Sequence, residues 1–85
     1  HKSLEYIFQR KIEIMNKESI AKIWVTADAV WIRTTDGREA SELFSNYVRL
    51  QKATDEQRGN YRVSHFGIHW PEIDEDLSFD GFFAR

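Results

Sequence analysis

Two adjacent runs of β-branched and aromatic residues constrain the fold of this chain most. Residues 20–26 and 29–35 are joined by the two-residue link Ala27-Asp28. Two such runs with so short a link are typical of an antiparallel hairpin. Asp36-Gly37 marks a second turn, because glycine readily adopts the positive φ that tight hairpin turns need. A third strand over residues 38–42 then completes a meander, and three strands are about the minimum for a stable small sheet.

Shorter signals follow the meander. Residues 45–52 are predicted to form a helix with Ser45 as its N-cap. Thr54 and Gln57 form a capping-box pattern, in which two side chains reciprocally satisfy free backbone N–H groups, and this pattern opens a short helix through Arg58. Residues 61–65 alternate like a fourth strand, and Ser78 is expected to cap a final helical turn. The predicted fold class is α+β: a small antiparallel β-sheet, made of a three-stranded meander plus a further strand, packed with two or three short helices.

The N-terminal segment carries an ambiguous pattern. A helical stripe and an alternating stripe both fit it, and its composition favours a helix. A chain of 85 residues has room for only one core. We therefore predict an N-terminal extension over residues 1–15, containing a helix, and a single α+β domain over residues 16–85.

Composition excludes several functional classes. The chain has no cysteine, which excludes thiol chemistry and zinc–thiolate sites and favours a reducing compartment. No apolar run approaches the roughly 20 residues that span a bilayer, so a cytoplasmic protein without a membrane anchor is expected. The net charge is −2, with lysine and arginine scattered among acidic residues. Direct nucleic-acid binding is not expected, because such proteins usually carry a basic patch.

An acidic run near the C-terminus, from Glu72 to Asp76, is the cluster that looks most chemical. Carboxylates and imidazole bind divalent ions, and His65 and His69 lie just upstream. However, the run lacks the alternating ligands and internal glycine of a calcium loop. The two histidines would also lie about 13 Å apart along a strand, too far to share a metal. No metal ligand set, cofactor or catalytic residue is therefore predicted.

A structural role is the preferred interpretation of this region. The carboxylates would solvate a loop and favour the N-terminus of a following helix through its dipole. His69 would pack against the Trp70 ring or bond to backbone, and Arg58 or Arg62 would form an ion pair with Asp74 or Asp76. If the region binds a ligand, the candidate binding residues are Trp70, His69, Asp74, Glu75, Asp76, Arg58 and Arg62.

Two stretches of the sequence carry a resemblance. They are Ala53-Thr54-Asp55-Glu56-Gln57-Arg58 with Tyr61-Arg62, and Gly67-Ile68-His69-Trp70-Pro71 with Ile73-Asp74-Glu75-Asp76-Leu77-Ser78-Phe79 and Gly81. Together they resemble the small prokaryotic domain of unknown function family 2442, over approximately residues 19–83. The resemblance implies a compact α+β domain, in some relatives fused to a helix-turn-helix DNA-binding domain or encoded beside small genes of mobile-element type. It implies no catalytic residue. Within the second stretch, we expect Gly67 to make a sharp bend and Trp70 and Ile73 to face inward.

These observations favour a non-enzymatic binding module, an accessory or antitoxin-like partner of another small protein. Three Trp, three Tyr and six Phe are many rings for so small an interior, so some are expected to line a partner surface. Self-association as a homodimer, through an edge strand or the C-terminal Phe cluster, is the second expectation. The alternative is a metal- or ligand-binding protein or hydrolase that uses the acidic loop at Asp74, Glu75 and Asp76.

Overall fold

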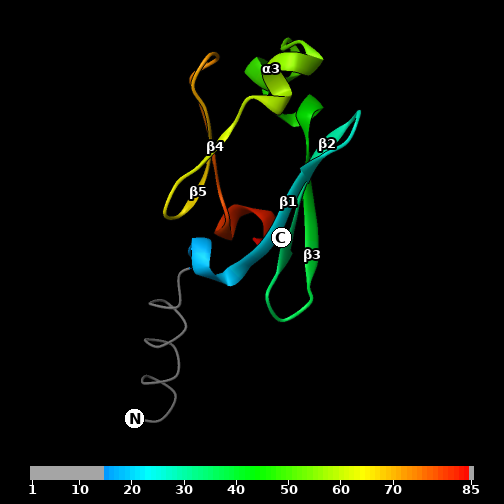
Figure 1. Cartoon of the computed structure of the whole chain (residues 1–85). Helices are drawn as coiled ribbons and strands as arrows, with labels where there is room; N and C mark the ends of the chain where they lie inside the picture. Colours follow the sequence, from blue (N-terminus) through cyan, green and yellow to red (C-terminus); the bar gives the residue numbers. More distant parts are fainter. Residues whose placement is uncertain (1–14, 85) are drawn as a thin grey trace, which may run out of the picture.

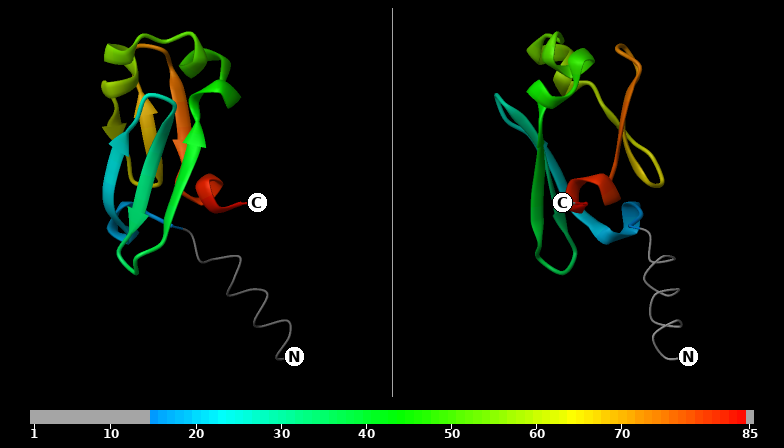
Figure 2. Two further views of the ribbon diagram at one scale, coloured as in Figure 1. Left: turned by 90° about the vertical axis from the view of Figure 1, so that its right-hand side faces the viewer. Right: turned by 180° about the vertical axis from the view of Figure 1, so that it is seen from behind.

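In residues 15–84, which the computed structural model describes, two three-stranded antiparallel sheets face each other across one hydrophobic core (Figure 1). Sheet A has the strand order β1-β2-β3, and sheet B has the order β4-β5-β6. Figure 2 shows the two sheets as layers, with sheet A in front in the left view. The strands are β1 (Ile20–Val25), β2 (Ala29–Thr34), β3 (Glu39–Leu43), β4 (Arg62–Val63), β5 (Gly67–Trp70) and β6 (Glu75–Ser78).

Short helical segments close the ends of the two layers. Helices α2 and α3 lie together at one end of the molecule, and η3 lies at the other end between the sheets (Figure 1). None of the helices within the described range is long and apolar enough to cross a membrane. The helical segments are η1 (Lys17–Ser19), η2 (Phe44–Asn46), α2 (Val48–Gln51), α3 (Asp55–Gly59) and η3 (Asp80–Phe83).

The predicted α+β class and the predicted meander are both confirmed. Trp24 pairs with Trp31 across the first hairpin, and Trp31 pairs with Ser41 across the second. Gly37 has φ +93°, the left-handed conformation for which glycine was expected at this turn. The predicted helix over residues 1–15 falls, except for Met15, outside the described residues.

The helix predicted over residues 45–52 differs from the observed structure. A 3₁₀ turn over Phe44–Asn46 comes first, and α2 begins only after Tyr47, whose backbone is extended at φ −131°. Ser45 is therefore not the N-cap of a long helix. Phe44 and Leu50 are both buried, and bringing both into the core breaks the segment into two pieces. The capping box of Thr54 and Gln57 is confirmed, with hydrogen bonds of 3.1 and 3.0 Å.

The second sheet is larger than the single further strand that was predicted. The fourth strand shortens to Arg62–Val63, and a β5–β6 hairpin occupies the region predicted as a bend and an acidic loop. Gly67 makes no bend: it lies in β5, where a Cβ would collide with the carbonyl oxygen of Leu77. The sharp turn comes later, at Asp74, which has φ +54°. Glycine at position 67 thus permits close approach of two strands.

The core lies between the sheets, and aromatic rings dominate it. Trp70 and Phe79 are fully buried, and Phe82 is 3% exposed. Burying a side chain of this size contributes about 1.5–3 kcal/mol, so a few rings supply much of the stability of so small a domain. Ser78 accepts a hydrogen bond of 3.0 Å from the N–H of Gly81, which supports the expected final turn. Phe79 and Phe82 belong to the core and Phe83 is only partly buried against it, so self-association through this Phe cluster stays a prediction. The buried apolar cluster comprises Val30, Ile32, Phe44, Leu50, Ile68, Trp70, Leu77, Phe79 and Phe82.

Candidate functional site

Trp70, a predicted binding residue, is an anchor of the core. Its side chain has no exposed surface, as expected for a residue predicted to face inward. The indole Nε1–H donates a hydrogen bond of 2.9 Å to the backbone carbonyl of Arg58. Its ring lies 6.1 Å from that of Tyr61, in a tilted arrangement. A fully buried indole whose single donor is satisfied holds α3 against sheet B.

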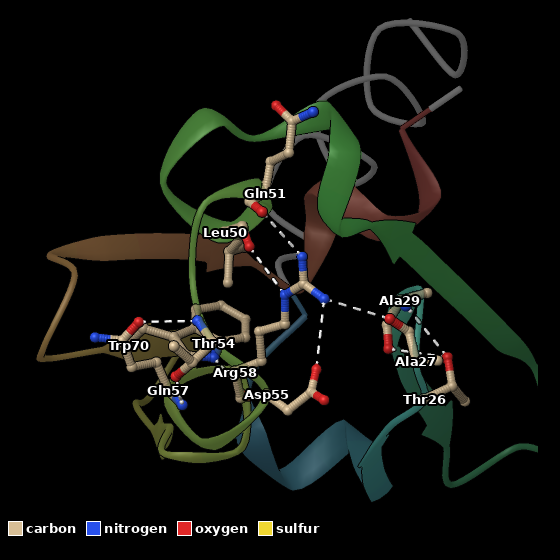
Figure 3. A network of polar contacts seen from close by, with 10 residues as sticks. All are labelled: Thr26, Ala27, Ala29, Leu50, Gln51, Thr54, Asp55, Gln57, Arg58 and Trp70. Atoms are coloured by element: carbon tan, nitrogen blue, oxygen red, sulfur yellow. Dashed lines mark hydrogen bonds and ion pairs between the residues drawn. The ribbon is translucent and has the colours of Figure 1, made fainter.

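Arg58 occupies the centre of a polar network that joins three parts of the chain (Figure 3). Its guanidinium donates hydrogen bonds of 3.0 Å to the carbonyl of Leu50, 3.1 Å to that of Gln51 and 3.4 Å to that of Ala27. The cation also lies 4.6 Å from the centre of the Phe44 ring. Leu50 and Gln51 end α2, where carbonyl groups lack partners within the helix. The Arg58 side chain therefore ties α2 to the β1–β2 turn.

The predicted ion pair of Arg58 or Arg62 with Asp74 or Asp76 is wrong, because neither arginine pairs with either carboxylate among the described residues. The carboxylate nearest to Arg58 is that of Asp55, at 3.9 Å, and it is fully exposed. The acidic turn instead receives Arg49, whose Nη1 donates a hydrogen bond of 2.8 Å to the backbone carbonyl of Asp74. The prediction rested on closeness in the sequence. In the structure, Trp70 packs in the core and bonds to the Arg58 carbonyl, and the Arg58 side chain lies against the end of α2.

Three of the predicted residues do come together, on the side of sheet B that faces away from the core. Arg62, His69 and Asp76 are directly paired across β4, β5 and β6. A hydrogen bond of 2.7 Å joins His69 Nδ1 and Asp76 Oδ1. His69 was expected to pack against Trp70 or to bond to backbone, and that is wrong. Successive residues of a strand point to opposite faces, so His69 points outward where Trp70 points inward.

The acidic residues diverge for the same reason. Glu75 pairs with Trp70, Asp76 pairs with His69, and Asp74 lies in the turn before them. These residues were expected to start a helical turn, and they do not. Their side chains also do not converge on one point. Among residues 15–84, no group of three or more His, Asp or Glu side chains is placed to hold a metal ion. Ligand binding by these residues stays a prediction.

A pair of stacked tryptophans, which was not among the predicted site residues, lies on sheet A. The rings of Trp24 and Trp31 have centroids 5.8 Å apart and an interplanar angle of 10°. Lys22 Nζ lies 5.2 Å from the centre of the Trp24 ring, and Arg33 Cζ lies 5.4 Å from it. The alternation of residues along the hairpin could have predicted this pair from the sequence. Because the link is short, the two tryptophans lie opposite each other, on the side of the sheet away from Ile23 and Ile32.

The tryptophans lie on the surface of sheet A that faces away from the core, which we call the outer face. Sheet B and the helices lie behind sheet A in the left view of Figure 2, and no described element covers this surface. Trp24 and Trp31 are each half-buried by their neighbours in the sheet, and Leu43 is 48% exposed. Arg33 is held beside them by an ion pair of 2.7 Å with Glu39. The outer face is formed by Lys22, Trp24, Trp31, Arg33, Glu39, Ser41 and Leu43.

Comparison with known proteins gives one match. A family described as "Protein of unknown function (DUF2442)" matches residues 20–85, which begins at the first strand of sheet A and includes the whole of sheet B. No curated protein and no solved structure matches the chain.

Proposed function

The chain belongs to the DUF2442 family, and we propose that it is a non-enzymatic binding module that recognises a partner protein through the outer face of sheet A. In this role it is an accessory, or antitoxin-like, partner of another small protein. The observation that carries the proposal is the stacked pair of Trp24 and Trp31 on a face that no described element covers.

The chemistry of the outer face suits a protein surface. Tryptophan and arginine are the residues that most often carry the binding energy of interfaces. The rings of Trp24 and Trp31 already stack, and Arg33 is already fixed by Glu39, so little side-chain entropy is lost when a partner binds. Partly exposed tryptophans beside the exposed Leu43, edged by charged side chains, are the kind of apolar surface that is typical of an interaction site.

The same stack also stabilises the first hairpin. A cross-strand aromatic pair contributes about 0.5–1.5 kcal/mol beyond the area that it buries. A test must therefore separate folding from binding. Threonine is the suitable replacement for Trp24 and Trp31, because its β-branched side chain keeps a high strand propensity.

The experiment is co-purification from native cell extract with three forms of the tagged protein. They are the wild type, the double variant W24T/W31T and the control F66S, which removes a half-exposed ring from the β4–β5 turn. Circular dichroism and thermal unfolding establish that each form is folded. We expect one set of proteins to be captured by the wild type and by F66S and lost with W24T/W31T. Capture of the same proteins by the folded double variant would overturn the proposal.

A metal- or ligand-binding protein or hydrolase is the second candidate, and the hydrogen-bonded pair of His69 and Asp76 favours it. One imidazole and one carboxylate fall short of the three protein ligands of a typical catalytic zinc site. Calorimetric titration with Mg²⁺, Mn²⁺, Ca²⁺ and Zn²⁺ tests this candidate. A saturable heat in the wild type that disappears in Asp76→Ala would favour it over the binding module.

A further inference from the structure

The two open sides of the sheet pair differ. On one side, η3 packs against both β3 and β6, the edge strands there. On the other side, β1 and β4 are the edge strands, and a groove of about 300 Å³ lies between them. The left view of Figure 2 shows β1 and β4 side by side along this margin, with η3 at the opposite margin. We call this space the side groove.

The side groove has an apolar lining and basic side chains. Ile20 and Ile23 of β1 lie on one wall, and Tyr61 and Val63 lie on the other. Val63 is 48% exposed, which is high for an aliphatic side chain in a strand. The charged groups of the lining are two lysines, and it includes no carboxylate. The lining residues are Lys17, Ile20, Ala21, Lys22, Ile23, Tyr61 and Val63.

Some backbone N–H and C=O groups of β1 point toward the side groove. In an antiparallel pair, alternate residues of an edge strand direct their N–H and C=O groups away from the neighbouring strand. The carbonyl of Ile23 is one of these, because it accepts a hydrogen bond from the Tyr61 hydroxyl on the far wall. That bond is long, at 3.5 Å, and therefore weak. A backbone N–H from an added strand would make a better bond to the same carbonyl.

We propose that the partner protein inserts an extended segment with acidic side chains into the side groove, where it adds to β1 as a fourth strand of sheet A. This inference rests on the proposed function and specifies the chemistry of the partner. Backbone hydrogen bonds to β1 hold the segment, its alternate apolar side chains cover Ile23 and Val63, and its carboxylates meet Lys17 and Lys22. Lys22 also lies over the Trp24 ring, so the side groove and the outer face are continuous.

A second copy of the chain fits the side groove poorly. Antiparallel pairing of β1 with β1 would bring Lys22 of each copy into the same interface, where like charges repel. The acidic edge strand β6 carries Glu75 and Asp76 and would complement the lysines. That contact joins two different surfaces, so it runs head to tail and does not close into a dimer. A different chain is therefore the better occupant.

The first test uses blocked synthetic peptides of about six residues, the usual length of a strand. One peptide alternates valine with glutamate, and the other alternates valine with lysine. Amide chemical shifts and amide exchange of the ¹⁵N-labelled protein are followed during each titration. We expect the glutamate peptide to shift the amides of Ala21, Ile23 and Val63 and to slow exchange at Ile23, and the lysine peptide to do neither. A glutamate peptide that leaves these amides unchanged would overturn the inference.

Charge reversal supplies the matched variants. We expect K17E/K22E to weaken binding of the glutamate peptide about tenfold or more, and K52E, at an exposed lysine outside the side groove, to leave it unchanged. Equal weakening by K52E would mean that attraction is general and would overturn the inference. So would light scattering that shows a dimer of the protein alone which K17E/K22E dissociates, because the occupant would then be a second copy.

The inference and the proposed function fail in different ways. If K17E/K22E captures the native partner as well as the wild type while W24T/W31T does not, the outer face stands and the side-groove inference is overturned. If W24T/W31T captures the partner and K17E/K22E does not, the outer-face proposal fails and the side groove is the binding site. If both variants lose the partner, the single variant K17E decides, because Lys17 lines the side groove and is not part of the outer face: loss of the partner with K17E supports the side groove, and capture by K17E overturns the side-groove inference.

Discussion

Arg58 shows at the scale of one residue how this fold uses a charged side chain. The guanidinium forms its hydrogen bonds mainly with backbone carbonyls, and the side chain is only 17% exposed. A planar fork of N–H groups can reach carbonyls in several directions at once, and a lysine ammonium cannot reproduce that geometry. The Phe44 ring packs against the guanidinium cation as a further contact. The residue therefore acts as a bracket between α2 and the β1–β2 turn.

Replacing Arg58 by lysine is expected to lower the free energy of unfolding by about 2–3 kcal/mol, because the carbonyl of Gln51 loses its donor and that of Leu50 keeps only backbone donors such as the N–H of Ala53. Urea denaturation measures the change. The control is Arg62→Lys, at an exposed position of β4, for which we expect a change within about 0.5 kcal/mol. Equal effects of the two substitutions would contradict the bracket role.

Asp36 gives a prediction about pH. Hydrogen bonding from the Thr34 hydroxyl, together with the nearby Arg38 side chain, lowers the pKa of the Asp36 carboxyl. A carboxyl whose pKa is lower in the folded state stabilises the fold when it is ionised, above the unfolded pKa of about 3.9, and loses that contribution as the pH falls through its folded pKa.

We therefore expect Asp36→Asn to lower the free energy of unfolding at about pH 6 and to have little effect at about pH 2. Urea denaturation of both proteins across this range measures the difference. A difference that grows as the pH falls would show that the sign is wrong.

At the scale of the element, the β5–β6 hairpin is held by the close approach of two backbones. Gly67 pairs with Ser78, and the carbonyl of Leu77 occupies the space that a side chain at position 67 would need. Acidic residues are depleted in strands, which is why a loop was predicted where Glu75 and Asp76 form β6. The pairing with β5 and the burial of Leu77 outweigh that preference.

Gly67→Ala is expected to lower the free energy of unfolding by about 2–3 kcal/mol, because the new methyl group collides with backbone that cannot rotate away. Gly59→Ala is the matched control. A Cβ there meets nothing within 4 Å, and alanine is the better helix former at the end of α3, so stability should stay the same or rise by up to about 1 kcal/mol. Thermal unfolding of both variants is the measurement. Destabilisation by Gly67→Ala alone supports the close approach of the two strands, whereas equal destabilisation by both variants would contradict it.

At the scale of the whole molecule, the two sheets share one core, and we therefore expect them to fold as one unit. Phe79 is fully buried in the apolar cluster to which Val30 and Ile32 of sheet A and Ile68 and Trp70 of sheet B also belong. A three-stranded sheet with nothing packed on it is marginal in water. Neither sheet is therefore expected to persist without the other.

Phe79→Ala is expected to cost about 3–5 kcal/mol, a large part of the 5–15 kcal/mol that typically stabilises a domain. Amide exchange should speed up in β2 and β5 together, and tryptophan fluorescence and circular dichroism should report one transition. Phe66→Ala, at a side chain that is 50% exposed, is the control and should change stability by about 0.5–1 kcal/mol. Protection that survives in sheet A alone would contradict the shared core.

Local chemistry is what the sequence by itself determined. The first hairpin, the Gly37 turn and the capping box of Thr54 and Gln57 each depend on groups only a few residues apart, so pattern and propensity are sufficient to predict them.

Only the tertiary structure decided where the long-range groups meet. Arg58 reaches the carbonyl of Ala27, 31 residues away, and Trp70 reaches the carbonyl of Arg58, 12 residues away. The conversion of the acidic run into a strand, and the outward pairing of His69 with Asp76, likewise follow from packing against partners distant in the chain. Burial of the rings selected these contacts from many that local preference allowed, because the free energy of a small domain depends mostly on filling its single core.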